Sequence, residues 1–173
     1  MATKVSIESL MEVFYKTPTK EFTLRGLAKE AGLSHTAVIK FVNALKKRNF
    51  VKIEAFGRAK KVSFNMESEE AVREKRMRNI KAAEAIKEEI LKSGIDAKAI
   101  ILFGSFSRGE DIESSDIDIA VVGRKNFKAD FSKIEKKLNR RVNIIFFDIF
   151  RKIPENLRGS IINGVKLYGV IDV

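Results

Sequence analysis

Two acidic residues separated by a single residue follow a glycine-serine pair in the second half of the chain. Asp116 and Asp118 open an apolar, β-favouring segment, and Gly104 and Ser105 directly follow another one, residues 100–103. Because residues two apart in a strand point to the same face, the two carboxylates are predicted to lie side by side. Two carboxylates held a few ångströms apart repel each other unless a divalent cation neutralises them. The pair therefore predicts a site for Mg²⁺ or Mn²⁺.

The glycine-serine pair is suited to a bulky anion. Gly104 lets the backbone approach a phosphate closely, and the hydroxyl and N–H groups at Ser105 can donate hydrogen bonds to phosphate oxygens. Arg108 adds a positive charge on the same turn, and a salt bridge to an acidic residue within 110–113 is its alternative role. Phosphates on one side and metal-binding carboxylates on the other predict a site for a nucleoside triphosphate with magnesium.

These residues resemble the minimal nucleotidyltransferases of the DNA polymerase β superfamily. The pattern of that family is Gly-Ser, ten residues, and then Asp-x-Asp; here residues 106–115 separate Gly104-Ser105 from Asp116-Ile117-Asp118. The resemblance implies an α/β fold with a small mixed sheet, ATP as substrate or ligand, and Mg²⁺ or Mn²⁺ as cofactor. It also implies that Asp116 and Asp118 are both metal ligands and catalytic residues, and that Gly104, Ser105 and Arg108 bind the nucleotide.

The position of the family's third carboxylate holds an amide in this chain. In the family this carboxylate lies on the strand after the intervening helix, and the matching stretch, residues 142–145, has Asn143 in its place. An amide oxygen can coordinate a cation but cannot accept a proton, and losing a general base costs about 10²–10⁴ in rate. Asn143 is therefore a candidate catalytic-site residue that leaves open whether the site turns over.

Composition and charge limit the class of protein. Hydrophobic residues make up 45% of the 173 residues, which supports folded cores, and the absence of cysteine excludes disulfides and cysteine nucleophiles. No apolar run can span a bilayer and no signal-peptide pattern is present, so we expect a cytoplasmic protein without a membrane partner. Residues 1–66 hold 13 basic and 5 acidic residues, and the whole chain carries a net charge of +11. This excess predicts a polyanionic partner, nucleic acid above all, with a generally lysine-rich proteome as the alternative.

Helical spacing and strand alternation predict a winged helix-turn-helix in residues 1–66. The expected elements are three helices and a hairpin, at residues 6–16, 24–30, 34–48 and 50–66. Such a domain binds DNA with its third helix and with the tip of its hairpin. The candidate DNA contacts are His35, Thr36, Ile39, Lys40, Asn43 and Lys47 on the helix, and Arg58, Lys60 and Lys61 on the hairpin. A merely solvated lysine face and a protein-docking role are the alternatives.

We therefore expect a two-domain protein. A mainly α winged helix-turn-helix domain (1–66) is followed by a connecting helix (67–92), whose predicted apolar stripe includes Met77, and by a nucleotidyltransferase-like α/β domain with a small mixed sheet (93–173). The first hypothesis is an enzyme that transfers a nucleoside monophosphate, AMP in particular, from ATP to a protein or a small hydroxyl acceptor. The family resemblance suggests an antitoxin, with a partner toxin protein as acceptor.

The second hypothesis is a DNA-binding transcriptional regulator. In it, the nucleotidyltransferase-like domain is a catalytically weak or inactive nucleotide sensor or dimerisation unit. Asn143 favours this hypothesis. A homodimer is compatible with both hypotheses, because winged-helix regulators often bind paired half-sites.

Overall fold

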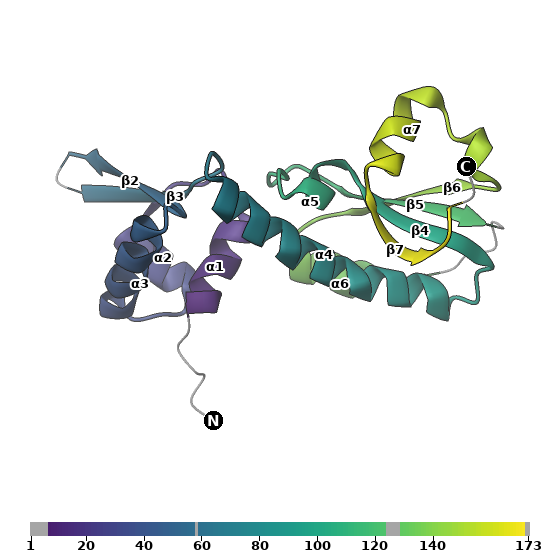
Figure 1. Cartoon of the computed structure of the whole chain (residues 1–173). Helices are drawn as coiled ribbons and strands as arrows, with labels where there is room; N and C mark the ends of the chain where they lie inside the picture. The colour runs from purple at the N-terminus through teal and green to yellow at the C-terminus, as the bar shows by residue number, and fades with distance from the viewer. Residues whose placement is uncertain (1–6, 58, 124–128, 172–173) are drawn as a thin grey trace. The chain divides into compact units, whose positions relative to one another are not determined.

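A computed structural model describes residues 7–57, 59–123 and 129–171 of the chain. The chain divides into two compact units, Met1–Val72 and Arg73–Val173, and the division falls inside the long helix α4 (Glu69–Lys92). Figure 1 shows the order of the elements along the chain. The functional division into residues 1–66, 67–92 and 93–173 stays a prediction. None of the described helices has the length and the apolar composition that crossing a membrane requires.

Three helices and a three-stranded antiparallel sheet make up the N-terminal unit. They are α1 (Ile7–Lys16), α2 (Leu24–Ala31) and α3 (His35–Lys47), with β1 (Phe22–Thr23), β2 (Val51–Phe56) and β3 (Ala59–Phe64) in the sheet order β1-β3-β2. Thr23 and Ser34 start α2 and α3, because their side chains accept hydrogen bonds from backbone N–H groups of the first turns. The predicted helices and hairpin are confirmed. Strand β1 was not predicted.

The C-terminal unit is built on a four-stranded mixed sheet, as predicted. Its strands are β4 (Ala97–Phe103), β5 (Ile117–Gly123), β6 (Val142–Phe147) and β7 (Val165–Gly169), in the order β6-β5-β4-β7. Strands β5 and β6 are parallel, and the other pairs are antiparallel. The helices besides α4 are α5 (Gly104–Arg108), α6 (Ser132–Leu138) and α7 (Glu155–Ile162), with a 3-10 turn η1 (Phe150–Lys152).

The two central strands are apolar on both faces because helices cover both faces. Ile100 and Ile119 pack with α4 and α6 on one face, whereas Ile101 and Ala120 pack with η1 and α7 on the other. Figure 1 shows α7 on the opposite side of the sheet from α4 and α6. Side chains of successive strand residues alternate between these two cores, so the register of each strand decides which side chains reach which face.

The buried stripe of α4 differs from the prediction at one position. Met77 was expected in the stripe, but it is 63% exposed, whereas Lys75 and Asn79 are completely buried. The stripe continues from these two polar residues to Ala83 and Ile86 at helical spacing. The prediction of Met77 was wrong because hydrophobicity alone was used to choose the inward face, and two inward residues are polar.

Candidate active site

The register of the sheet brings the second aspartate next to two other predicted site residues. Asp118 is paired with Phe103, the residue before Gly104, on β4 and with Asn143 on β6. Strand alternation places Asp118 and Asn143 on the face of the sheet that carries α7, while Ile117 on β5 belongs to the opposite core. The structure therefore gathers residues from three separate segments of the chain.

Asn143 contacts Asp118 directly. Its amide Nδ2 donates a hydrogen bond to Asp118 Oδ1 at 2.9 Å. Asn143 is exposed and Asp118 is half-buried. The hydrogen bond orients the Asp118 carboxylate from the neighbouring strand β6.

Gly104 lies against the same carboxylate. Its backbone has φ +72°, and a Cβ atom added at this position would be 2.5 Å from Asp118 Oδ2. Such a distance is far shorter than a van der Waals contact, and a positive φ is in addition unfavourable for residues with a Cβ. Both reasons favour glycine at position 104. The contact is with Asp118, and the predicted close approach of a phosphate to Gly104 stays a prediction.

Ser105 and Arg108 are the other residues of the turn that were predicted to bind the nucleotide. Ser105 is half-buried directly after Gly104, and the hydroxyl of Ser107 donates to the Gly104 carbonyl at 2.7 Å. Arg108 is exposed, and its Nε donates to Glu110 Oε2 at 2.6 Å. Of the two roles considered for Arg108, the structure shows the salt bridge.

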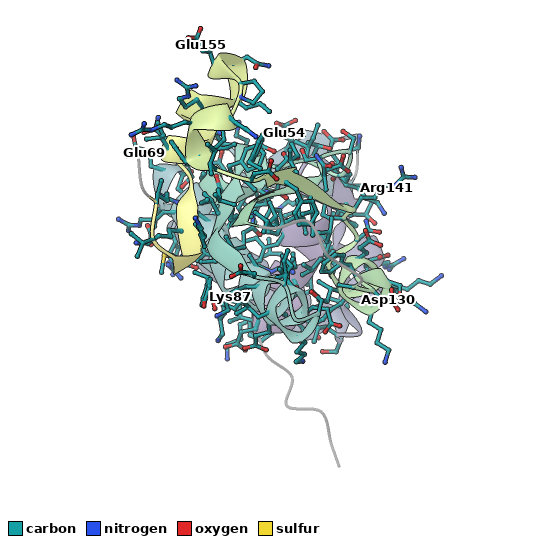
Figure 2. The ribbon with its side chains drawn as sticks, turned by 90° about the vertical axis from the view of Figure 1, so that its right-hand side faces the viewer. Glu54, Glu69, Lys87, Asp130, Arg141 and Glu155 are labelled. Carbon is teal, nitrogen blue, oxygen red and sulfur yellow. The ribbon has the colours of Figure 1, made fainter. Side chains whose placement is uncertain are left out.

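Asp116 lies just before β5 at the edge of a polar groove. The groove has a volume of about 530 Å³, and it is lined by Glu113, Ser114, Ser115, Asp116, Glu135, Asn139, Arg140 and Arg141. Asp116 and Arg141 are both exposed in it. Figure 2 shows the Arg141 side chain extending outward from the ribbon. A hydroxyl-bearing molecule in this groove would be next to Asp116.

The donor types of the predicted site suit a magnesium ion that keeps part of its water shell. Asp116 and Asp118 offer carboxylate oxygens and Asn143 an amide oxygen, the ligand types that Mg²⁺ prefers. Within the described residues no group of three or more Asp, Glu, His or Cys side chains forms a complete cage. Mg²⁺ is usually held by one or two carboxylates together with substrate phosphates, so this donor set is suitable for it.

A buried polar cluster behind the Gly104-Ser105 turn was missed by the sequence reasoning. Lys75, Asn79, Asp111 and Arg140 are each at most 5% exposed. Burial lowers the pKa of Lys75, and the Asp111 carboxylate only partly offsets this effect. The spacing of Lys75 and Asn79 on the inward face of α4 is the one signal in the sequence that could have indicated the cluster.

A protein-family comparison covers this unit. The family described as "Nucleotidyltransferase domain" matches residues 80–168, which is half of the chain. The chain belongs to the nucleotidyltransferase domain family. The matched region contains the glycine-serine turn, both aspartates and Asn143, so the nucleotidyltransferase domain includes every residue of the candidate active site.

One curated relative of this nucleotidyltransferase carries a more specific name. It is "Putative protein adenylyltransferase MJ1379" of Methanocaldococcus jannaschii, 42% identical over 64 residues, which are 33% of this chain and 64% of the relative. The chain thus spans slightly less than two thirds of that relative. A comparison with solved structures gave no match.

Outside the nucleotidyltransferase domain, the predicted DNA-contact residues of α3 share one solvent-facing side. All six are exposed: His35, Thr36, Ile39, Lys40, Asn43 and Lys47. The opposite side of α3 is buried through Val38, Val42 and Leu45. The helix is therefore amphipathic, and its free side is the one that the prediction chose.

The predicted DNA-contact residues of the hairpin differ in their exposure to solvent. Arg58 lies outside the described residues. Lys60 is exposed, whereas Lys61 is half-buried and its Nζ donates to Glu21 Oε2 at 2.6 Å. Lys60 also lines a groove of about 590 Å³ together with His35 and Arg25, a basic residue of α2 that the sequence reasoning did not select.

Proposed function

We propose that the protein transfers AMP from ATP to a hydroxyl group of a protein or small acceptor, and that its N-terminal unit binds DNA as a winged helix-turn-helix. The observation that carries the first part is the register that brings Asp118 against Gly104 and Asn143 at one end of the sheet. The family match and the name of the relative support nucleotidyl transfer.

Each residue of the turn and of the strands has a role in this proposal. Gly104 and Ser105 hold the triphosphate, because the glycine permits close approach and the serine offers a hydroxyl donor. Asp116 and Asp118 hold Mg²⁺ or Mn²⁺, which supplies charge neutralisation at the α-phosphate when bound. Asn143 orients Asp118 through its hydrogen bond. The site thereby places a phosphate-binding turn directly beside a metal-binding carboxylate.

The chemical step is a substitution at the α-phosphorus. The acceptor oxygen forms a bond to this phosphorus, the bond to the bridging oxygen of the β-phosphate breaks, and pyrophosphate leaves. The hydroxyl proton passes to water or to a carboxylate of the site. An attacking group must enter opposite the leaving group. We place the acceptor in the groove beside Asp116, whose lining includes neither Gly104 nor Ser105.

The N-terminal unit suits nucleic acid because its exposed side combines hydrogen-bonding and basic groups. Helix α3 presents Asn43 and Thr36 together with Lys40 and Lys47, groups that can contact base edges and phosphates. The groove with Arg25, His35 and Lys60 adds positive charge between α3 and the hairpin. An antiparallel hairpin that follows three helices supports the proposed winged helix-turn-helix.

A second candidate function follows from Asn143. A neutral amide at the third position lowers the charge of the site by one and cannot act as a base. The nucleotidyltransferase domain would then bind ATP without turnover and regulate the DNA-binding unit. An antitoxin role, with a partner toxin as the protein acceptor, belongs to the first candidate function.

The deciding experiment is transfer of label from α-labelled ATP, with Mg²⁺ or Mn²⁺, to the protein itself and to proteins of a lysate. Wild type is compared with the double variant Asp116→Ala/Asp118→Ala. The matched control is Asp96→Ala/Asp148→Ala, which removes two exposed carboxylates of the same unit away from the site. Label that persists in the control and disappears in the first variant supports transfer.

The second candidate function predicts a different pattern. ATP then binds wild type in calorimetry, no label is transferred, and Asn143→Asp creates transfer. If neither binding nor transfer occurs with any acceptor, both candidate functions of the nucleotidyltransferase domain are wrong.

A further inference from the structure

Helix α4 supplies hydrogen-bond donors to the end of the short helix α5. Asn79 Nδ2 donates to the Phe106 carbonyl at 3.0 Å, and Arg76 Nε donates to the Ser107 carbonyl at 3.1 Å. The last carbonyl groups of a helix have no partner within that helix, and a five-residue helix has few internal hydrogen bonds of its own. Donors from a long neighbouring helix therefore hold α5 in place.

Lys75 extends this contact into the loop after α5. Its Nζ donates to the Gly109 carbonyl at 3.3 Å and to the Asp111 carbonyl at 2.5 Å. Lys75 has no exposed surface, so the ammonium group has exchanged its hydration for these carbonyls and the Asp111 carboxylate. An ammonium group buried in this way is held in a single geometry, and it holds the loop in turn.

The Asp111 carboxylate is the centre of the cluster. Oδ1 accepts from Lys75 Nζ at 2.6 Å and from Asn79 Nδ2 at 2.7 Å, and Oδ2 accepts from Arg140 Nη2 at 3.3 Å. Asp111 itself is 1% exposed. Three side chains from two other segments thus converge on one carboxylate within the ten-residue spacer of the family pattern.

The positions of these residues along the chain connect the cluster to the candidate site. Asp111 lies between Ser105 and Asp116, and Arg140 lies three residues before Asn143. A buried ion pair is weak evidence for stability, because apolar residues of similar volume often stabilise a core as well or better. What the cluster does provide is a fixed geometry among the three segments that carry the phosphate-binding turn, the aspartate pair and Asn143.

We propose that Lys75, Arg76, Asn79 and Asp111 are positioning residues for the nucleotide. They hold the end of α5, the helix that begins with Gly104 and Ser105, and the loop after it in one orientation, and thereby set the affinity for the triphosphate. This inference rests on the proposed nucleotidyl transfer. It differs from a purely structural role, because a structural role would change the free energy of unfolding without changing the affinity of the folded protein for nucleotide.

The test is binding of Mg²⁺ with an ATP analogue that has a methylene group between the α- and β-phosphates, measured by calorimetry on the full chain. Arg76→Gln removes one hydrogen bond from an exposed side chain, so the fold is expected to persist. We expect its dissociation constant to rise about fivefold, the equivalent of one hydrogen bond. The matched control is Arg73→Gln, an exposed arginine of the same helix.

Lys75→Met is the second variant, because methionine approximates the shape of lysine without its charge. It removes the donor to two carbonyls, and we expect the dissociation constant to rise more than about tenfold. Lys81→Met, at an exposed position of α4, should bind as wild type does. All dissociation constants are measured at a temperature at which circular dichroism shows each variant to be folded.

The outcomes separate the two proposals. Weaker binding by folded Arg76→Gln and Lys75→Met, with unchanged controls, supports the positioning role. Unchanged binding by folded Arg76→Gln overturns it, even if the thermal midpoint falls. If wild type itself does not bind the analogue, the proposed nucleotide site is wrong, and the positioning role is wrong with it.

Discussion

Asn143 donates a hydrogen bond to Asp118 from the neighbouring parallel strand, at 2.9 Å. The register of β5 and β6 makes these two residues direct partners, so whatever side chain stands at position 143 acts on this carboxylate. The amide of Asn143 carries no charge, but it donates a hydrogen bond to the Asp118 carboxylate. A second carboxylate at this position would repel Asp118. The residue at position 143 therefore decides the charge beside Asp118, and with it the charge that the proposed cation would neutralise.

Asn143→Asp is expected to make the nucleotidyltransferase domain depend on a divalent cation. Two carboxylates at about 4 Å repel each other by about 1–4 kcal/mol, depending on their exposure to solvent. Without a cation the thermal midpoint should fall below that of wild type. With Mg²⁺ it should recover, and Mg²⁺ should bind more tightly than to wild type. Melting with and without Mg²⁺ is the measurement, and a variant insensitive to the cation would argue against a metal at Asp118.

Gly104→Ala is expected to slow the proposed nucleotidyl transfer by more than its effect on stability explains. The added Cβ would lie 2.5 Å from Asp118 Oδ2, so the carboxylate must move. A displacement of this kind can cost about 10² in rate. The positive φ adds a strain of roughly 1–2 kcal/mol in the folded protein. The measurement is the rate of label transfer together with the free energy of unfolding.

Gly94→Ala is the matched control for this substitution. Gly94 has φ +75°, close to the φ of Gly104, and a Cβ added there meets no atom within 4 Å. Both variants should therefore lose similar stability, but only Gly104→Ala should lose transfer. Equal losses of transfer in the two variants would mean that backbone strain, and not the contact with Asp118, is what matters.

Sequence reasoning succeeded where the signal is local. Hydrophobic spacing and capping residues such as Ser34 predicted the helices, and alternation predicted the strands that carry Asp118 and Asn143. It could not predict the strand β1, whose two residues are defined only by pairing with β3. Nor could it predict the cluster around Lys75, because its partner Asp111 is 36 residues further along the chain. A buried lysine resembles a solvated one until its partner is known.

The proposed DNA binding by α3 should weaken when the exposed lysines of this helix are removed. For Lys40→Ala/Lys47→Ala we expect a weaker affinity for duplex DNA and a less steep dependence of that affinity on salt. Each lost phosphate contact lowers the slope of log affinity against log salt by about 0.9. Lys136→Ala/Lys137→Ala, at exposed positions of α6, removes the same charge from the other unit. Equal effects of the two double variants, measured by fluorescence anisotropy, would indicate that net charge alone drives the binding.

The stability of the protein should rise at alkaline pH because of Lys75. Burial lowers the pKa of this lysine below its ordinary value of 10.5, with Arg140 and Arg78 adding to the effect and Asp111 opposing it. Between the lowered pKa and 10.5, the unfolded chain binds a proton that the folded chain has released, so the free energy of unfolding increases with pH. Below the lowered pKa both states hold the proton, and this contribution no longer changes with pH.

Lys75→Met removes the titrating group and should remove this rise. The measurement is the free energy of unfolding by denaturant at several pH values up to 10.5, for wild type and for the variant. The free energy of unfolding of wild type should increase relative to that of Lys75→Met as pH increases. The free energy of unfolding of Lys81→Met, an exposed position, should change with pH as that of wild type does. A difference that is constant with pH would mean that the folded and unfolded states hold the Lys75 proton equally. The ammonium group would then be compensated in full by Asp111 and the carbonyls that surround it.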